Sequence, residues 1–282
     1  MKHNKRFRKI YVEIGNRCNL SCHYCSPVRR TLRTMSVGEF DSIAAQISPL
    51  TDLIFLHVKG EPLLHPHLED ILRICHRHKL AVNLTTNGLL LAKVGAALLQ
   101  APALRQINIS LHSLAVHKQE NYLEQIWAFV AANVSRTLPC YISLRLWNYK
   151  DGVGSEGNRV ILDAIEKEFK ASLGQDVLQR YEGIKLGSHL YLNRDLVFTW
   201  PEMSHDLRTG ALFCPGLRDQ IAILADGTVT PCCLDSNGEI ELGNIFEQQI
   251  GEIVGSERCR AIVKGFSQNK AVEKLCKRCN SR

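Results

Sequence analysis

Three cysteines close to the start of the chain, Cys18, Cys22 and Cys25, are the residues best suited to carry chemistry. They form a C-x3-C-x2-C pattern within the sequence CNLSCHYC. Iron–sulfur clusters are normally held by four cysteine thiolates. A loop with three cysteines would bind three irons of a cubane cluster and leave the fourth iron open. The pattern therefore predicts a cluster that binds a further molecule through iron.

A zinc site is the alternative for the same residues. His23 lies inside the pattern, and zinc is commonly bound by a mixture of cysteine and histidine. Zinc sites usually pair one C-x2-C with a second C-x2-C or with histidines, whereas C-x3-C-x2-C is not a usual zinc spacing. The spacing therefore favours an iron–sulfur cluster over zinc.

The three cysteines resemble those of the radical S-adenosylmethionine (radical SAM) superfamily. Tyr24 matches the aromatic residue often found before the family's third cysteine. The resemblance implies a [4Fe-4S] cluster whose open iron binds the amino and carboxylate groups of SAM, with Tyr24 at the cofactor site. It also implies an electron donor such as flavodoxin or ferredoxin.

Short apolar runs alternate with longer helical patterns between residues 9 and about 172. The five runs are Lys9–Ile14, Leu53–Val58, Leu80–Thr85, Gln106–Leu111 and Tyr141–Leu146. Apolar strands of this kind suit a parallel sheet that is covered on both faces. Ser36 and Glu39 form a capping box that predicts the start of the first helix. The alternation predicts an α/β fold, a whole or partial βα-barrel with its active site at the C-terminal strand ends.

The family resemblance narrows this fold to a partial (β/α)6 TIM-like barrel. A sixth strand is expected near Leu190–Leu192 or Leu196–Thr199. We expect residues 1–185 to form the barrel core. Residues 186–282 would form a C-terminal extension, a small β-hairpin plus helix that binds a second cluster.

Polar residues follow the predicted strands at the edge where the active site would lie. Gly60, Glu61 and Pro62 resemble the family's glycine-rich segment, which contacts the amino group of SAM. A glycine lets the backbone approach closely, and a carboxylate or carbonyl accepts hydrogen bonds from an ammonium. The resemblance implies further cofactor contacts at Thr86, Asn87, Ser110 and Arg145. The alternative for these residues is a turn or a solvated strand end.

A second group of cysteines lies near the C-terminus. Gln220–Ala225 and Val229–Cys233 flank an Asp-Gly pair and predict a hairpin. Thiolates on this hairpin, together with a distant C-x2-C, could bind zinc or an iron–sulfur cluster. The order of Cys214, Gly227 and Cys232 resembles the start of the SPASM extension of radical SAM enzymes, in its shortened Twitch form.

The SPASM/Twitch resemblance implies one auxiliary [4Fe-4S] cluster. Its implied ligands are Cys214, Cys232, Cys276 and Cys279. Cys233 is adjacent to Cys232 and remains an alternative ligand, because neighbouring cysteines cannot easily bind the same cubane. The remaining cysteines lie in apolar or helical patterns and are expected in the core: Cys75, Cys140 and Cys259.

Histidines His57, His65 and His67 surround the Gly60–Pro62 segment. Three histidines so close together could indicate a second metal. His65 and His67 flank a proline, however, and do not form a regular helical i,i+4 pair. Their spacing therefore does not favour a metal site.

Composition bounds the remaining possibilities. At 282 residues, the chain is long enough to bury a sizeable core. No apolar run reaches the ~18 residues of a membrane span, and no apolar h-region follows the basic start, so we expect a cytoplasmic protein. Eleven cysteines then favour metal binding over disulfides. The formal charge of +7 is modest, and nucleic acid is a possible but not a favoured partner.

The resemblance implies an enzyme, a SAM-dependent radical oxidoreductase. Such an enzyme cleaves SAM reductively to a 5′-deoxyadenosyl radical, which abstracts a hydrogen atom from a substrate. An auxiliary cluster suits a net oxidation, either dehydrogenation of a small molecule or modification of a peptide side chain. The alternatives are a radical SAM enzyme that modifies RNA, or a zinc or iron–sulfur protein that is not an enzyme. No residue stands out in the sequence as the catalytic base.

Overall fold

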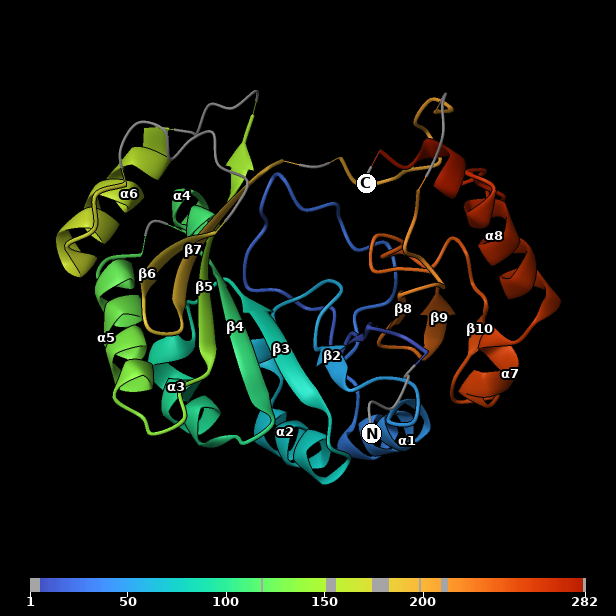
Figure 1. Cartoon of the computed structure of the whole chain (residues 1–282), viewed down its shortest axis with the longest axis horizontal. Helices are drawn as coiled ribbons and strands as arrows, with labels where there is room; N and C mark the ends of the chain where they lie inside the picture. Colours follow the sequence, from blue (N-terminus) through green and yellow to red (C-terminus); the bar gives the residue numbers. More distant parts are fainter. Residues whose placement is uncertain are drawn as a thin grey trace. The chain divides into compact units, whose positions relative to one another are not determined.

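The computed structural model describes residues 6–117, 119–150, 156–173, 183–197, 199–208 and 213–280. The chain divides into two compact units (Figure 1). The first comprises Met1–Cys18, Ser26–Val82 and Phe198–Arg282, and the second comprises Asn19–Cys25 and Asn83–Val197. The chain passes from the first unit to the second within a single strand, β3 (Ala81–Thr86).

The first unit contains a sheet with the strand order β10-β9-β8-β1-β2. Its strands are β1 (Lys9–Val12), β2 (Leu53–Phe55), β8 (Gln220–Ile223), β9 (Thr228–Thr230) and β10 (Gly243–Asn244). β1 pairs in parallel with β2 on one side and with β8 on the other. Because both edges of β1 are paired, its apolar residues become fully buried, as in Ile10 and Val12.

β8 and β9 form the predicted C-terminal hairpin. They pair in antiparallel orientation, and Gly227 in the turn between them adopts φ +88°. A residue other than glycine would be strained in this conformation. The Asp-Gly signal in the sequence therefore marked a true hairpin, although its second strand is shorter than the predicted Val229–Cys233.

The helices described in the first unit are α1 (Val37–Ile47), α2 (Leu68–Arg77), α7 (Ile250–Val254) and α8 (Glu257–Ser267). Two of them, α1 and α8, begin at a serine that caps them. Ser36 caps α1, and Glu39 reaches back to the Ser36 amide, which confirms the predicted capping box. Ser256 caps α8 in a similar way, by accepting a hydrogen bond from the amide of Cys259.

The second unit has the strand order β3-β4-β5-β7-β6. After β3 its strands are β4 (Leu104–Ser110), β5 (Tyr141–Tyr149), β6 (Ile184–Gly187) and β7 (Leu190–Leu196). β5 pairs in parallel with β4 and with β7, and β6 pairs with β7 in antiparallel orientation. β7 occupies the place predicted for the sixth strand. Phe198, within the second predicted range for that strand, lies outside the described residues.

Helices α3 (Leu91–Gln100), α4 (Leu114–His117), α5 (Tyr122–Val134) and α6 (Glu156–Phe169) complete the second unit. α3 packs against α5, where Gly95 lies against the ring of Phe129. Strand–helix alternation with mostly parallel pairing confirms the predicted α/β class. The structure also confirms the three predicted core cysteines, because Cys75, Cys140 and Cys259 are all buried. Among the described residues, no helix is long and apolar enough to cross a membrane.

Candidate iron–sulfur and SAM site

The C-x3-C-x2-C cysteines lie in the segment between β1 and α1, which we call the cluster loop (residues 13–36). Cys18 and Cys25 are exposed, Cys22 is partly exposed, and none of the three forms a disulfide. The amide of Cys25 donates a 3.0 Å hydrogen bond to the carbonyl of Cys22, which gives this part of the loop a tight turn. The thiols are therefore accessible to incoming iron and sulfide.

The base of the cluster loop is closed by backbone pairing. Gly15 and Thr34 form an isolated antiparallel bridge, and the amide of Asn16 donates to the carbonyl of Arg33 at 3.1 Å. The buried side chain of Asn16 adds two bonds, from its Nδ2 to the Thr31 carbonyl and from the Arg33 amide to its Oδ1. The loop therefore leaves and re-enters the first unit through a fixed stem.

Gly60 packs directly against this stem. Its φ is +78°, and a Cβ atom added to it would lie 2.5 Å from the Gly15 carbonyl oxygen and 2.8 Å from that of Arg17. The amide of Glu61 donates to the same Arg17 carbonyl at 2.8 Å. Only glycine fits this position, which gives a physical reason for the glycine of the predicted SAM segment.

The Glu61 carboxylate caps the next turn of the chain. Its Oε1 accepts a 3.0 Å hydrogen bond from the Leu63 amide and caps the short 3-10 turn Pro62–Leu64. Pro62 begins that turn and is buried with Leu63. The turn fixes the direction in which the chain leaves Gly60.

In the second unit, the end of β3 contacts the part of the cluster loop assigned to that unit. The Nδ2 of Asn87 donates a 2.8 Å hydrogen bond to the Oδ1 of Asn19, between the first two cysteines. The Asn87 carbonyl accepts from the Tyr122 hydroxyl at 2.8 Å, and the buried Thr86 hydroxyl accepts from the Gly88 amide. Asn87 is therefore held from both sides and in turn holds the loop.

Tyr24 lies against His112 at the end of β4. Their ring centroids are 4.9 Å apart in an edge-to-face arrangement. Burial, followed by the neighbouring Cys22 thiol, raises the pKa of Tyr24. Burial lowers the pKa of His112 to about 4, although its hydrogen bond with the Arg145 carbonyl acts in the opposite direction. His112 is therefore neutral near pH 7.

Ser110 and Arg145 are direct partners in the parallel pairing of β4 and β5, so their side chains share one face of the sheet. The Arg145 guanidinium carbon lies 4.2 Å from the centroid of the Trp147 ring. Trp147 was not among the predicted site residues, because its position within a strand carries no sequence signal of this contact.

The four predicted auxiliary ligands belong to three segments of the first unit: Cys214 before β8, Cys232 after β9, and Cys276 and Cys279 at the C-terminal 3-10 turn. Burial raises the pKa of Cys276, and the Cys214 and Cys279 thiols raise it further. The pKa of Cys232 is raised by burial and by the thiols of Cys233, Cys214 and Cys276. The Cys276 and Cys232 thiols are therefore both buried, and the Cys214 thiol acts on each of them.

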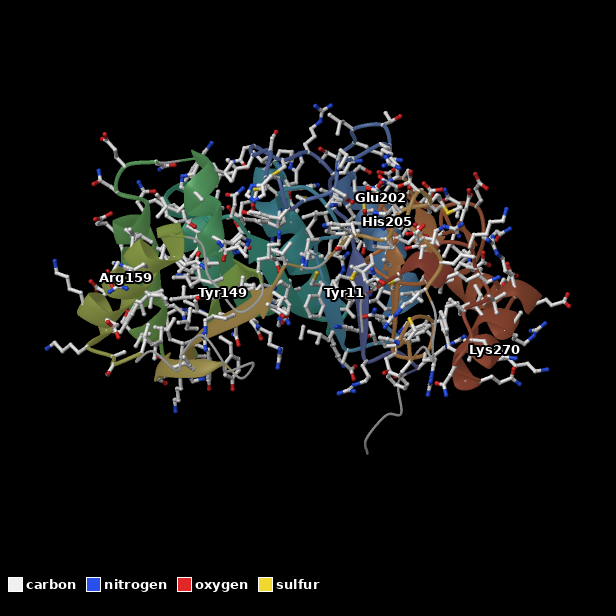
Figure 2. All side chains as sticks on the ribbon, turned by 90° about the horizontal axis from the view of Figure 1, so that it is seen from above. Tyr11, Tyr149, Arg159, Glu202, His205 and Lys270 are labelled. Atoms are coloured by element: carbon white, nitrogen blue, oxygen red, sulfur yellow. The ribbon has the colours of Figure 1, made fainter. Side chains whose placement is uncertain are left out.

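Cys233 faces a different environment from Cys232. It packs against an apolar cluster of strand residues that includes Tyr11, labelled in Figure 2, and Leu224. Burial raises its pKa, while a hydrogen bond with Tyr11 acts in the opposite direction. The orientation of Cys233 toward this cluster supports Cys232 as the auxiliary ligand.

The donor chemistry of both sites fits iron–sulfur clusters. Among the residues that the structure describes, no three Cys, His, Asp or Glu side chains converge as the ligands of a single metal ion. A cubane has different requirements, because each thiolate binds a separate iron and the sulfur ligands stay apart.

The histidines near Gly60 are engaged in local hydrogen bonds. His65 donates from Nε2 to the Met35 carbonyl at 2.8 Å and accepts at Nδ1 from the His67 amide. Both ring nitrogens are thus used, and a metal site at His65 is not supported.

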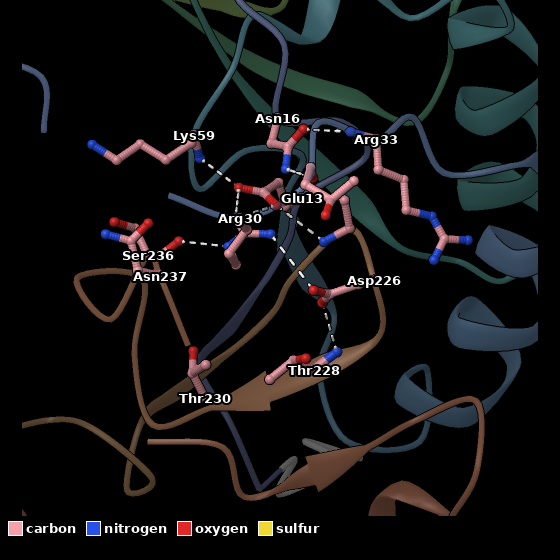
Figure 3. Close-up of polar contacts among 12 residues, drawn as sticks. Glu13, Asn16, Arg30, Arg33, Lys59, Asp226, Thr228, Thr230, Ser236 and Asn237 are labelled. Atoms are coloured by element: carbon pink, nitrogen blue, oxygen red, sulfur yellow. Dashed lines mark hydrogen bonds and ion pairs between the residues drawn. The ribbon is translucent and has the colours of Figure 1, made fainter. Parts of the chain in front are cut away.

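One buried ion pair has no counterpart in the sequence predictions. Figure 3 shows Glu13, immediately after β1, bound by the guanidinium of Arg30. An acidic residue that ends an apolar run is the only sequence signal of this pair. Its partner could not be identified, because the cluster loop contains several arginines.

Comparison with known protein families supports the same assignment. Residues 12–131 match the radical SAM superfamily, and residues 214–280 match SPASM, an iron–sulfur cluster-binding domain. The chain belongs to the radical SAM superfamily. This radical SAM enzyme uses SAM, a [4Fe-4S] cluster and an auxiliary iron–sulfur cluster in its SPASM domain.

Curated relatives of this radical SAM enzyme match it over a limited region. GTP 3',8-cyclase of Mycobacterium ulcerans is 30% identical over 150 residues, which are 48% of this chain and 41% of the relative. GTP 3',8-cyclase of Picosynechococcus sp. is 37% identical over 114 residues, 37% of this chain and 34% of the relative. The chain thus spans about two fifths of the length of these relatives.

Solved structures match over nearly the whole radical SAM enzyme. BtrN in complex with AdoMet and 2-DOIA has a TM-score of 0.58 and 18% identity, and the match covers 98% of this chain and 94% of BtrN. SuiB of Streptococcus suis bound to S-adenosylmethionine has a TM-score of 0.65 and 14% identity, with 99% and 73% covered. AnSMEcpe with bound AdoMet and a peptide gives 0.60 and 14%, with 96% and 86% covered. These likenesses confirm the predicted fold class, a radical SAM barrel fold with a C-terminal cluster-binding extension.

Proposed function

We propose that Cys18, Cys22 and Cys25 hold the [4Fe-4S] cluster at which this enzyme reductively cleaves SAM. When bound, this cluster and SAM supply a 5′-deoxyadenosyl radical, which abstracts a hydrogen atom from the substrate. Accessible thiols on a loop with a fixed stem support this assignment. The three residues would hold the cluster while the stem limits how far the loop can move.

We assign the contacts to SAM to Gly60, Glu61 and Pro62, in the segment that follows β2, and to residues in or directly after β3, β4 and β5. Gly60 gives the backbone the close approach that a ligand needs, and Glu61 and Pro62 fix the turn that follows it. Thr86 and Asn87 end β3, and Asn87 also anchors the cluster loop through Asn19.

Ser110 and Arg145 would contact the polar end of SAM from β4 and β5. Their shared register places both side chains on one face of the sheet, and an arginine is suited to a carboxylate. Tyr24, supported by the His112 ring, would pack against the cofactor from the cluster loop.

For the auxiliary cluster, we propose Cys214, Cys232, Cys276 and Cys279 as ligands and a net two-electron oxidation as the reaction. One electron would leave the substrate with the hydrogen atom that forms 5′-deoxyadenosine. The second would pass to the auxiliary cluster, and a proton would go to a base. The observation that carries this proposal is that all four cysteines lie within residues 214–280, the region that matches the SPASM iron–sulfur cluster-binding domain.

The substrate class is proposed from the solved structures with the same fold. BtrN was solved with 2-DOIA, and SuiB was solved with a precursor peptide. A small molecule or a peptide side chain therefore fits this fold better than a nucleic acid. An external one-electron donor of the flavodoxin or ferredoxin kind would reduce the enzyme before each turnover.

The test is metal analysis of the Cys18/Cys22/Cys25→Ala triple variant after anaerobic reconstitution. We expect about four irons and four sulfides per chain to remain, with the electron paramagnetic resonance (EPR) signal of one reduced cubane. Zinc in place of iron would make the C-terminal site structural and would contradict the oxidation. The parent enzyme should form 5′-deoxyadenosine from SAM under reduction, and the triple variant should not.

A further inference from the structure

Two residues on opposite sides of the three cysteines form a buried ion pair at the cluster loop. Arg30 Nη2 donates to both carboxylate oxygens of Glu13, at 2.9 Å to Oε1 and 2.7 Å to Oε2 (Figure 3). The Glu13 side chain is fully buried, and that of Arg30 is 11% exposed. The pair therefore clamps the loop together on both sides of Cys18, Cys22 and Cys25.

The C-terminal hairpin and the segment that follows β9 contact the same two side chains. The Ala225 amide, in the turn after β8, donates to Glu13 Oε2 at 3.0 Å. Arg30 Nε donates to the Ser236 carbonyl at 3.0 Å, and its Nη1 lies 4.0 Å from Asp226. We call Glu13, Arg30 and these hairpin contacts the junction.

A third segment joins the junction through its backbone. The Lys59 amide, immediately before Gly60, donates to Glu13 Oε1 at 3.0 Å. Burial raises the pKa of Glu13, and the Arg30 charge and the two backbone amides act in the opposite direction. A single carboxylate thus connects the cluster loop, the glycine segment and the hairpin that leads to Cys232.

The segment after β9 and Glu202, which precedes the hairpin, also hold the chain next to Arg30. The Arg29 amide donates to Asn237 Oδ1 at 3.1 Å, and the Arg29 guanidinium pairs with Glu202 at 2.9 Å. The return arm of the cluster loop is therefore fixed by side chains and carbonyls of the C-terminal part of the first unit. The two arms of the loop do not need the hairpin for their backbone pairing, which the Gly15–Thr34 bridge already supplies.

We propose that the junction transmits the position of the C-terminal hairpin to the cluster that binds SAM, and that Arg30 is a positioning residue for that cluster. The guanidinium forms fixed, directional bonds to the carboxylate and to the hairpin carbonyl at the same time. Loss of either contact releases the return arm of the loop and changes the relative placement of the three cysteines. The proposal rests on the proposed function, because it requires a cluster at Cys18, Cys22 and Cys25.

The test compares Arg30→Gln and Arg30→Lys with a matched control, Arg33→Gln. Arg33 lies in the same loop and forms its own ion pair with Glu39, away from the junction. Each full-length variant is reconstituted anaerobically. Its iron content, its Kd for SAM by equilibrium dialysis and its EPR spectrum with and without SAM are then measured.

We expect Arg30→Gln to keep its auxiliary cluster while its Kd for SAM rises at least about tenfold and SAM no longer gives the parent EPR spectrum. Arg30→Lys should restore part of the affinity, and Arg33→Gln should behave as the parent. A merely stabilising role would lower the melting temperature of Arg30→Gln and leave the Kd and spectrum of the folded enzyme unchanged. That result would overturn the proposal, as would an equal change in Arg33→Gln.

A second variant covers the case in which Arg30→Gln does not fold, because Glu13 would then remain buried without its partner. Asn237→Ala removes the hairpin acceptor for the Arg29 amide at an exposed site. We expect its Kd for SAM to rise severalfold with unchanged auxiliary iron, and a parent-like Kd would count against the junction. Failure of the parent itself to bind SAM would instead contradict the proposed function.

Discussion

The Lys59 ammonium lies 3.3 Å from the centroid of the Trp200 ring and donates a 2.9 Å hydrogen bond to the carbonyl of Ser26. Ser26 directly follows Cys25, and Lys59 directly precedes Gly60. Lys59 is only 3% exposed. Its side chain therefore holds the cluster loop just after Cys25, whereas its backbone amide belongs to the junction.

Replacing Lys59 with methionine should destabilise the protein by about 2 kcal/mol, because a desolvated cation–π contact and a charged hydrogen bond are both lost. Chemical denaturation of the variant would measure this change. Lys9→Met is the matched control, since the Lys9 ammonium lies 5.4 Å from the Tyr11 ring and 5.2 Å from the Phe55 ring. Its loss should cost less than about 1 kcal/mol. An equal loss of unfolding free energy in the two variants would show that the Trp200 contact stabilises the protein no more than the Lys9 contacts do.

Gly60→Ala should cost at least about 2 kcal/mol of stability and abolish SAM binding. The new Cβ would meet the Gly15 carbonyl at 2.5 Å in a backbone conformation that alanine rarely adopts. Gly38→Ala is the control, because nothing lies within 4 Å of its Cβ position in α1. That variant should gain about 0.5–1 kcal/mol from the higher helix propensity of alanine. Normal SAM affinity in Gly60→Ala would show that the backbone there has room to move.

The two adjacent cysteines should respond differently to substitution. Cys232→Ser should remove the auxiliary cluster, and Cys233→Ser should retain it, because the Cys233 side chain faces the apolar cluster around Tyr11. Iron and sulfide content of each variant, in the Cys18/Cys22/Cys25→Ala background, gives the answer. Full iron in Cys232→Ser and none in Cys233→Ser would exchange the two assignments.

His112 should make the protein less stable in mild acid. Its pKa is about 4 in the folded state, below the ordinary value of about 6.5, so the unfolded chain binds the proton first. Stability should therefore fall as the pH decreases from about 6.5 to about 4, by about 3 kcal/mol in all for this group.

The contribution of His112 is read from the difference between the parent and His112→Asn, because other titrating groups affect both proteins alike. Unfolding free energies from urea titrations at several pH values provide this difference. The free energy of unfolding of the parent, relative to that of His112→Asn, should fall steadily as the pH is lowered. A difference that does not change with pH would mean that His112 is solvated in the folded protein.

Local patterns predicted most of the helices and strands well. Apolar runs located the strands, the Asp226-Gly227 pair located the hairpin, and Ser36 with Glu39 located the start of α1. Strand ends were less accurate, and the second strand stops at Phe55 rather than at Val58. A strand ends where its backbone hydrogen bonds to the neighbouring strand end. This pairing depends on residues that are distant in sequence and absent from a local pattern.

Contacts between distant segments were beyond the reach of the sequence. Arg30 binds the Ser236 carbonyl, and Glu13 accepts from the Ala225 amide, which are backbone groups with no sequence signature. The hydrogen bond from Asn87 to Asn19 could not be predicted either, because an Asn-Gly pair in a sequence primarily indicates a turn. The orientation of Cys233 likewise depends on β1, which is far away in sequence.

The pairing of β1 with β8 has a consequence for the biogenesis of the enzyme. β1 and the cluster cysteines leave the ribosome early, but their partners Gln220–Ile223 and Ala225 are made about 200 residues later. Contacts of such long sequence separation form late in folding. We therefore expect nascent chains arrested before the hairpin to leave Cys18, Cys22 and Cys25 without their final support. Stable insertion of the SAM-binding cluster would then have to wait until the hairpin has been synthesised and has paired with β1.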